Sequence, residues 1–205
     1  MDDGSLVIHA AVEGIIDDAV AQKLIIEAGG KPGTIYGKKG KNFLQQKIQG
    51  FNNAAKIWPW LVLIDLDNDA ECPPPFCMHS VPNPSRYLCF RVAVREVESW
   101  LMADADTLAS FLGISIAIVP KDPEKLKNPK EKLIYLASRS RRKAIRKDMV
   151  PRQGSGRSEG PAYVSRMVEY VQDFWRPEVA GKHAESLRRA IACLRRIIAQ
   201  AFARS

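Results

Sequence analysis

The chain has 205 residues, of which 46% are hydrophobic and 26% are charged, and this balance is typical of a folded globular protein and excludes a disordered one. Its apolar runs are far shorter than the ~20 residues that cross a bilayer, and its four cysteines are too few for a disulfide framework, so we expect a cytoplasmic protein without a membrane-spanning segment. The formal net charge of +8 suits a polyanionic partner.

The predicted elements alternate between strands and helices in the first part of the chain. We predict strands over residues 6–12, 34–36, 60–66 and 87–94, and helices over residues 17–28, 41–55 and 96–112. Asp17 or Asp18 is placed to cap the first helix, and a Pro-rich loop that begins with Pro73 follows the third strand. This alternation predicts an α/β fold with a mainly parallel sheet flanked by helices. The apolar run at the third strand indicates a strand covered on both faces.

The chain after residue 120 is helical and strongly basic. We predict helices over residues 130–147, 162–175 and 184–203, with a Gly/Ser/Arg loop over residues 151–161. Counting Lys and Arg against Asp and Glu gives residues 1–120 a net charge of −4 and residues 121–205 a net charge of +12. We therefore predict an α/β core over residues 1–120 and a basic helical extension over residues 121–205 that packs on the core.

Acidic side chains follow the predicted strands at the points where the strands end. They are Glu13 at the first strand, Asp65, Asp67, Asp69 and Glu71 at the third, and Glu96 and Glu98 at the fourth. Strand residues two apart point to the same face, so we expect Asp65 and Asp67 to aim at one point above the sheet edge. Converging carboxylates repel one another unless a cation intervenes, and hard oxygen ligands favour Mg²⁺ or Mn²⁺ over zinc. Asp17, Asp69 and Glu71 also suit a plainer role as loop residues or helix caps.

Three short motifs carry a resemblance to a known family. Glu13 and Gly14 form a Glu-Gly turn within residues 12–20, which looks like the turn that opens the Toprim fold of topoisomerases, primases and nucleases of the overcoming-lysogenization-defect type. Asp65 and Asp67 resemble the Asp-x-Asp that ends the third strand of that fold. Residues 95–101 are similar to the Glu-aromatic-Leu signature of its nuclease branch. The whole chain, including residues 148–152 and 160–180, further resembles a family of small bacterial Toprim-like proteins with no established activity.

The resemblance implies a divalent-metal site for phosphoryl transfer. Asp65 and Asp67 would bind Mg²⁺ or Mn²⁺, Glu13 would bind the metal or act as general acid/base, and Asp69 or Glu98 would help to hold a second metal. The chain has no room for the accessory domains of a topoisomerase, so hydrolysis or an inactive relative fits better than strand passage. The nuclease relatives also imply a role in phage or genome defence, and a protein partner such as an ATPase.

Basic side chains supply the candidate contacts to nucleic acid. They are Lys38, Lys39 and Lys41 after the second strand, and basic residues of the extension that include Lys130, Arg139, Arg141, Arg142, Lys143, Arg146, Arg152 and Arg157. Such side chains position a nucleic-acid backbone without reading its sequence. A solvated helix with an ordinary excess of Lys and Arg is the plainer interpretation.

The expected function is therefore a metal-dependent Toprim-type nuclease that acts on DNA or RNA. A non-catalytic Toprim-like module that binds nucleic acid or a protein is one alternative. An Asp-x-Asp phosphatase is another, although such phosphatases normally continue the motif with Gly-Thr, where this chain has Asn68 and Asp69. Sugar-nucleotide transferases also carry Asp-x-Asp, but they would leave the Glu13-Gly14 turn unexplained.

Overall fold

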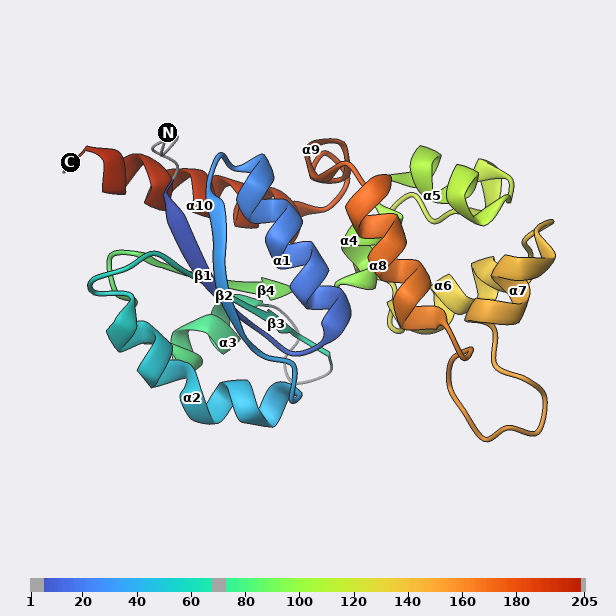
Figure 1. The fold of residues 1–205 in the computed structure, drawn as a ribbon, viewed down its shortest axis with the longest axis horizontal. Coiled ribbons are helices and arrows are strands. Elements are labelled where there is room, and N and C mark those ends of the chain that lie inside the picture. Colours follow the sequence, from blue (N-terminus) through green and yellow to red (C-terminus); the bar gives the residue numbers. More distant parts are fainter. Residues whose placement is uncertain (1–5, 68–72, 204–205) are drawn as a thin grey trace.

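Four strands form one sheet in the computed structural model, which describes residues 6–67 and 73–203 (Figure 1). The strands are β1 (Val7–Val12), β2 (Lys31–Gly37), β3 (Trp60–Asp65) and β4 (Leu88–Ala93), in the spatial order β2-β1-β3-β4. All neighbouring strands are parallel, and Val62 of β3 pairs with Ala11 of β1 and with Phe90 of β4. The predicted parallel sheet is confirmed.

Helices occupy much of the remaining chain. They are α1 (Ile15–Glu27), α2 (Lys41–Ala54), α3 (Pro73–Ser80), α4 (Glu98–Met102), α5 (Ala105–Leu112), α6 (Pro129–Ser138), α7 (Lys143–Met149), α8 (Tyr163–Asp173), α9 (Pro177–Ala180) and α10 (Glu185–Phe202), with 3₁₀ turns η1 (Ile116–Ile118) and η2 (Pro123–Lys125). The predicted helical C-terminal region is therefore confirmed. In the described part of the chain, no helix combines the length and apolar character needed to cross a membrane.

Helices cover both faces of the sheet because β3 directs its apolar side chains alternately to two cores. Leu61 and Leu63 are fully buried in the core that contains residues of α1 and α10. Val62 and Ile64 are fully buried in the core that α2 forms on the opposite face, with Phe76 of α3 packed against it. The prediction that this strand is covered on both faces is confirmed.

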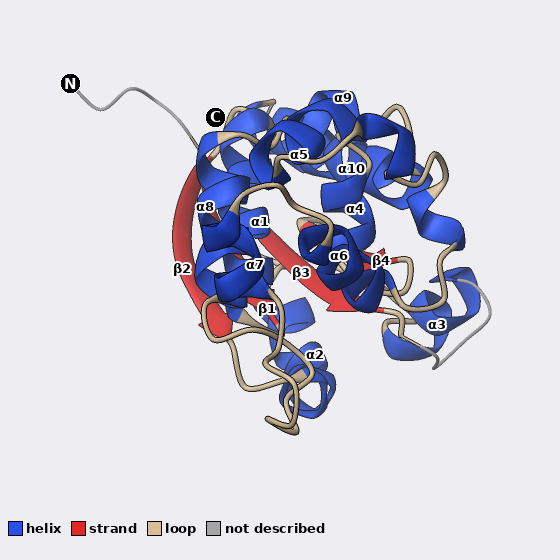
Figure 2. Ribbon diagram, turned by 90° about the vertical axis from the view of Figure 1, so that its right-hand side faces the viewer, coloured by secondary structure: helices blue, strands red, loops and turns tan. Residues whose placement is uncertain are grey.

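The helices after β4 gather beyond one end of the sheet and then return to it. Helix α8 packs against α1, α4 packs against α6, and α10 runs back to pack on β4 (Figure 1). Figure 2 looks onto these helices, with the strands behind them. The helical extension therefore contacts the sheet's own helices as well as the sheet.

The predicted Pro-rich loop is wrong at its start, because Pro73, Pro74 and Pro75 form the first turn of α3. Proline lacks a backbone N–H, but the N–H groups of a first turn have no partner within the helix, and the fixed φ of proline suits this position. A run of prolines therefore begins a helix here instead of preventing one.

Two of the predicted long helices are each interrupted by a tertiary contact. Between α4 and α5, Asp104 leaves the helical conformation (φ −92°, ψ 72°), and its carboxylate accepts hydrogen bonds from Arg176. Between α6 and α7, the Ser140 hydroxyl donates to the carbonyl of Leu112 and accepts from the N–H of Arg142. Apolar periodicity does not report such contacts between distant residues, so the predicted helices were too long.

Replacing Asp104 tests the contact with Arg176 that interrupts the first of these predicted helices. Its side chain is fully buried, and the Arg176 guanidinium donates to it at 2.6 and 2.9 Å. Removing one partner of a buried hydrogen bond costs about 1–3 kcal/mol, so we expect Asp104→Ala to lower the free energy of unfolding at pH 7 by about 2 kcal/mol. The measurement is urea unfolding of the variant and the wild type.

The loss of stability in Asp104→Ala is predicted to depend on pH. Burial raises the pKa of Asp104, but the hydrogen bonds and charge of Arg176 outweigh burial and hold the pKa below its ordinary value. A lowered pKa stabilises the folded state above the unfolded-state pKa of about 4, and this contribution is lost as the pH falls through the folded-state value. The control is Asp106→Ala, because Asp106 is 75% exposed and lies 3.9 Å from Arg176. Equal losses of stability in Asp104→Ala and Asp106→Ala would contradict the role assigned to the contact between Asp104 and Arg176.

Candidate active site at the carboxyl edge of the sheet

The carboxyl ends of the four strands meet at one edge of the sheet, where the strand order reverses. From β1 the sheet extends to β2 on one side and to β3 and β4 on the other. In open parallel sheets such a reversal forms the crevice in which ligands bind. Glu13 directly follows β1, Asp65 ends β3, and Glu96 and Glu98 follow β4. The fold therefore places the predicted carboxylates at this edge.

Three residues other than glycine adopt a positive φ in the described part of the chain, and each lies just beyond a strand at this edge. They are Lys38 after β2 (φ 60°), Asp67 after β3 (φ 50°) and Arg95 after β4 (φ 65°). The N–H of Asp67 donates to the carbonyl of Arg95 (2.8 Å), and the Arg95 guanidinium donates to the carbonyl of Asp67 (2.6 Å). Strained backbone persists where its surroundings hold it, and it concentrates at functional sites.

The premise that Asp65 and Asp67 share one face does not hold, because strand alternation stops at Asp65. That residue ends β3, and Asp67 lies beyond it in the left-handed conformation. The Asp67 carboxylate instead forms a 2.8 Å ion pair with Lys41. Lys41, predicted to contact nucleic acid, therefore already serves a carboxylate of this edge.

Main-chain hydrogen bonds position two of the carboxylates. Glu13 Oε1 accepts from the N–H of Asp65 (2.9 Å), which ties the end of β1 to the end of β3. Asp65 Oδ1 accepts from the N–H of Val97 (3.0 Å), directly before α4. Hydrogen bonds to a charged acceptor are stronger than those between neutral groups. The backbone of the fold therefore orients these two side chains.

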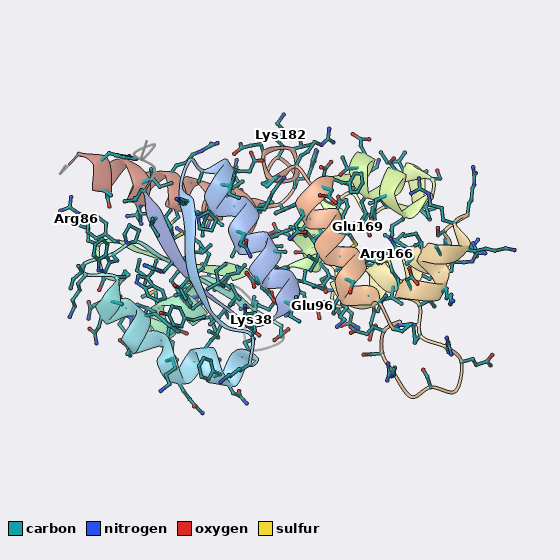
Figure 3. The ribbon with its side chains drawn as sticks, viewed as in Figure 1. Lys38, Arg86, Glu96, Arg166, Glu169 and Lys182 are labelled. Atoms are coloured by element: carbon teal, nitrogen blue, oxygen red, sulfur yellow. The ribbon has the colours of Figure 1, made fainter. Side chains whose placement is uncertain are left out.

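A cleft of about 380 Å³ opens at this edge, and residues from both parts of the chain line it. The core contributes Asp17, Asp65, Glu96, Glu98 and Lys38, and the extension contributes Lys130 and Val164. Figure 3 labels Lys38 and Glu96 where the sheet meets the later helices. The N–H of Lys130 donates to Glu96 Oε2 (2.7 Å), and the Tyr163 hydroxyl donates to Glu98 Oε1 (3.1 Å). The extension therefore completes the wall of the cleft.

Burial raises the pKa of several carboxyl groups at this edge, among them those of Glu13, Asp17, Asp65 and Glu98. It raises the pKa of Glu13 and of Glu98 to about 7, and the pKa of Asp17 to about 6. Burial raises the pKa of Asp65 well above its ordinary value, and the negative charges of Asp17 and Glu98 raise it further. Full ionisation is therefore unfavourable unless a cation compensates it.

Asp17 belongs to this cluster, although its position in the sequence equally suits a helix cap. Gly14 occupies the cap position of α1, where no side chain bonds the cap, so the predicted cap at Asp17 or Asp18 is wrong. Asp17 is 6% exposed, and its Oδ1 has no hydrogen-bond partner among the described residues. An unpaired, buried carboxylate oxygen is costly. One feature of the sequence points to this role: Asp17 lies four residues after Glu13, in the helix that follows the same strand.

The carboxylates at this edge fit a magnesium site in which water and substrate supply most of the ligands. Over residues 6–67 and 73–203, no three His, Cys, Asp or Glu side chains are arranged to hold a metal ion, and Asp69 lies outside the described residues. Mg²⁺ is commonly held by one or two carboxylates together with waters and substrate phosphates. The described carboxylates fit such a water-rich site, and they do not form a preformed cage of three protein ligands.

The predicted nucleic-acid contacts separate into structural and exposed side chains. The Arg142 guanidinium donates to the carbonyl of Phe111 (3.0 Å), and that of Arg146 donates to the carbonyl of Ser140, so both support the turn between α6 and α7. Lys39, Arg139, Arg141, Lys143, Arg152 and Arg157 are exposed, and so is Arg142 despite its contact with the carbonyl of Phe111. Among the predicted basic residues, Lys38 and Lys130 line the cleft, whereas Lys39, Lys41 and the predicted residues from Arg139 to Arg157 do not.

Comparisons of the chain with models of protein families, with curated proteins and with solved structures find no match. The four parallel strands in the order β2-β1-β3-β4 are consistent with a Toprim-like fold. The structure thus supports a parallel α/β fold, and the closer family assignment rests on the three sequence motifs.

The raised pKa of Glu13 predicts how a variant changes stability with pH. A carboxyl group whose pKa is about 7 when folded and about 4.3 when unfolded destabilises the folded state progressively as the pH rises between these values. Glu13→Gln removes this penalty and keeps an oxygen that accepts from the N–H of Asp65. We therefore expect its melting temperature to exceed that of the wild type at pH 8 and to match it at pH 4. Equal differences at the two pH values would contradict the burial of an ionisable group here.

Proposed function

We propose that this chain is a divalent-metal-dependent nuclease that hydrolyses phosphodiester bonds in DNA or RNA. The observation that carries the proposal is the cluster of buried carboxylates with raised pKa values at the reversal point of a parallel sheet. A structural role alone gives no reason to place several mutually repelling carboxylates in one open cleft. The three Toprim-like motifs add support, because they supply Glu13, Asp65 and Glu98.

The residues of the cleft, together with Glu13 and Asp67 at the same edge of the sheet, have separate tasks in this proposal. Asp65, with Asp17 or Asp67, would hold Mg²⁺ or Mn²⁺, which when bound neutralises charge on the phosphodiester and lowers the pKa of a bound water. Glu13 has a pKa of about 7 and is therefore suited to exchange a proton at neutral pH. Lys130 and Lys38 line the cleft and would orient a substrate phosphate.

The charge distribution supports a polyanionic substrate. The exposed Arg152, together with Lys147 and Arg146, lines a separate groove of about 350 Å³ on the extension. A nucleic-acid backbone bound there would be held by phosphate contacts, while a second part of the strand enters the carboxylate cleft. Such contacts fix position and carry no sequence information.

A non-catalytic module that binds nucleic acid is the second candidate. It is favoured by one observation, the lack of three described side chains arranged to hold a metal ion. This candidate predicts that a DNA fragment binds equally well to the wild type and to Asp65→Asn, and that neither protein cleaves it.

Cleavage of labelled DNA and RNA with Mg²⁺ or Mn²⁺ tests the proposed nuclease. A positioned general acid or base typically contributes 10²–10⁴-fold, so we expect Glu13→Gln to lose activity by about 100-fold or more. Asp65→Asn should lose a similar amount, while its amide oxygen keeps the contact with the N–H of Val97. Asp106→Asn is the control, because that carboxylate is 75% exposed and lies outside the cleft. Unchanged cleavage by Asp65→Asn, or cleavage that persists after chelation, would contradict the proposal.

A further inference from the structure

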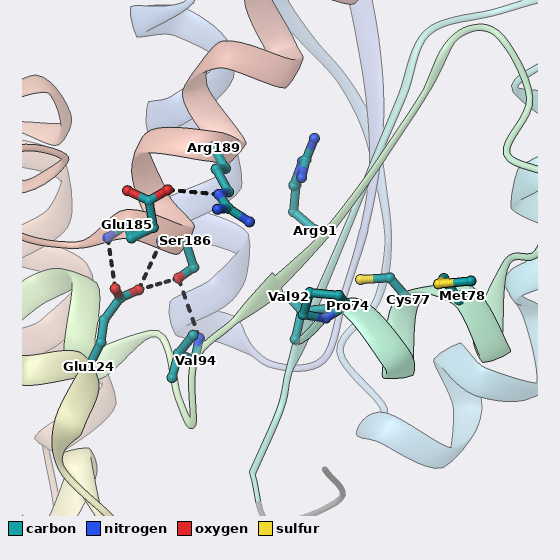
Figure 4. A pocket seen from close by; sticks show the side chains of 10 residues that line it. All are labelled: Pro74, Cys77, Met78, Arg91, Val92, Val94, Glu124, Glu185, Ser186 and Arg189. Atoms are coloured by element: carbon teal, nitrogen blue, oxygen red, sulfur yellow. Dashed lines mark hydrogen bonds and ion pairs between the residues drawn. The ribbon is translucent and has the colours of Figure 1, made fainter. Parts of the chain in front are cut away.

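A second cavity, of about 410 Å³, lies at the outer edge of the sheet (Figure 4), and it shares no lining residue with the carboxylate cleft. Strand β4 is the last in the spatial order, and β3 is its one neighbour. Val92 of β4 and Val94, just beyond the strand, line the cavity, with Pro74 and Met78 of α3 on one side and Arg189 of α10 on the other. The cavity is therefore a slot between the two helical layers, at the position where a fifth strand would lie.

The backbone of β4 presents unused hydrogen-bonding groups to this slot. The N–H of Trp60 in β3 donates to the carbonyl of Tyr87 (3.0 Å), and the parallel register continues this pattern through every second residue of β4. Phe90 and Val92 consequently direct their N–H and C=O groups away from β3. In the described part of the chain, these groups have no hydrogen-bond partner. A free edge of this kind is a template for another strand.

The free edge is short, because other contacts close both of its ends. The N–H of Leu88 donates to the carbonyl of Ser85 (3.0 Å), and the N–H of Val94 donates to the Ser186 hydroxyl (3.4 Å). The Ser186 hydroxyl is itself fixed by the indole N–H of Trp100 (2.7 Å). The open part of the edge therefore has room for a short extended segment and not for a long strand.

A positively charged side chain that has no carboxylate partner among the described residues faces the slot. Arg91 lines the cavity, and its Nε is buried without a hydrogen-bond partner. Its guanidinium interacts with the thiols of Cys89 and Cys193, and no carboxylate of the described residues forms an ion pair with it. The two acidic side chains nearby are already engaged: Glu124 accepts from the N–H groups of Glu185 and Ser186, and Glu185 accepts from Arg189 (2.8 Å). A ligand with a carboxylate would therefore complement Arg91.

We propose that this slot binds a short extended peptide of a partner protein, which adds to the sheet beside β4 and places an acidic side chain against Arg91. Main-chain bonds to Phe90 and Val92 would give the affinity, and the Arg91 guanidinium with the apolar surface of Met78 would give the selectivity. The exposure of Met78, 73%, is explained by this role. The peptide site is independent of the proposed nuclease activity, since it shares no residue with the carboxylate cleft.

A selection from a library of random nine-residue peptides displayed on phage, with the full chain as bait, tests this site. We expect enriched peptides that combine alternating apolar residues with an acidic residue. Their affinity should fall about tenfold or more in Arg91→Gln, which removes the charge. It should fall at least as much in Val92→Pro, which removes an outward N–H and leaves the bonds between β3 and β4 in place.

Controls separate loss of the site from loss of the fold. Val92→Thr keeps the outward N–H and should bind the selected peptides like the wild type, and Asp65→Asn should also bind them normally. Thermal unfolding shows whether Val92→Pro and Arg91→Gln remain folded, and amide shifts of Phe90 and Val92 on peptide addition locate the contact. The proposal is overturned if no peptide is enriched, or if the enriched peptides bind a folded Val92→Pro or Arg91→Gln as tightly as the wild type.

Discussion

The burial of mutually repelling carboxylates at one edge of the sheet is the constraint on which the rest of this site depends. Asp65 joins the contacts there, because its N–H donates to Glu13 and its carboxylate accepts from the N–H of Val97. Burial and the neighbouring negative charges together raise its pKa. The fold tolerates this arrangement by fixing the surrounding backbone, including the positive-φ residues Asp67 and Arg95, which bond each other. Such a cluster is stable when protons or a cation compensate the charge.

The helical extension contributes directly to the carboxylate site. Its Tyr163 donates to Glu98, and the main chain at Lys130 donates to Glu96, so the carboxylates that follow β4 receive their hydrogen bonds from the extension. Helix α10 returns to pack on β4, and Ser186 at its start bonds the indole of Trp100. The basic half of the chain therefore supplies both cationic surface and the second wall of the cleft.

The sequence predicted the sheet better than it predicted the cleft, and the difference has physical causes. A continuous apolar strand is recognisable because burial on both faces leaves no polar position, and Asp65 is conspicuous at its end. Asp67 was misplaced because strand geometry was extended past the last strand residue. Asp17 and Lys130 cannot be singled out as cleft residues from the sequence, because whether each faces the cleft depends on where α1 begins and on how α6 packs against α4. Apolar periodicity carries information about neither.

Titration of Mn²⁺ by calorimetry at pH 7.5, in two buffers with different ionisation enthalpies, tests the central claim most directly. Carboxyl groups with raised pKa values must lose protons when they bind a cation. We therefore predict that Mn²⁺ binding to the wild type releases protons, and that the Asp65→Asn variant does not bind Mn²⁺. The absence of Mn²⁺ binding to the wild type, or binding that is the same in Asp65→Asn, would contradict the account.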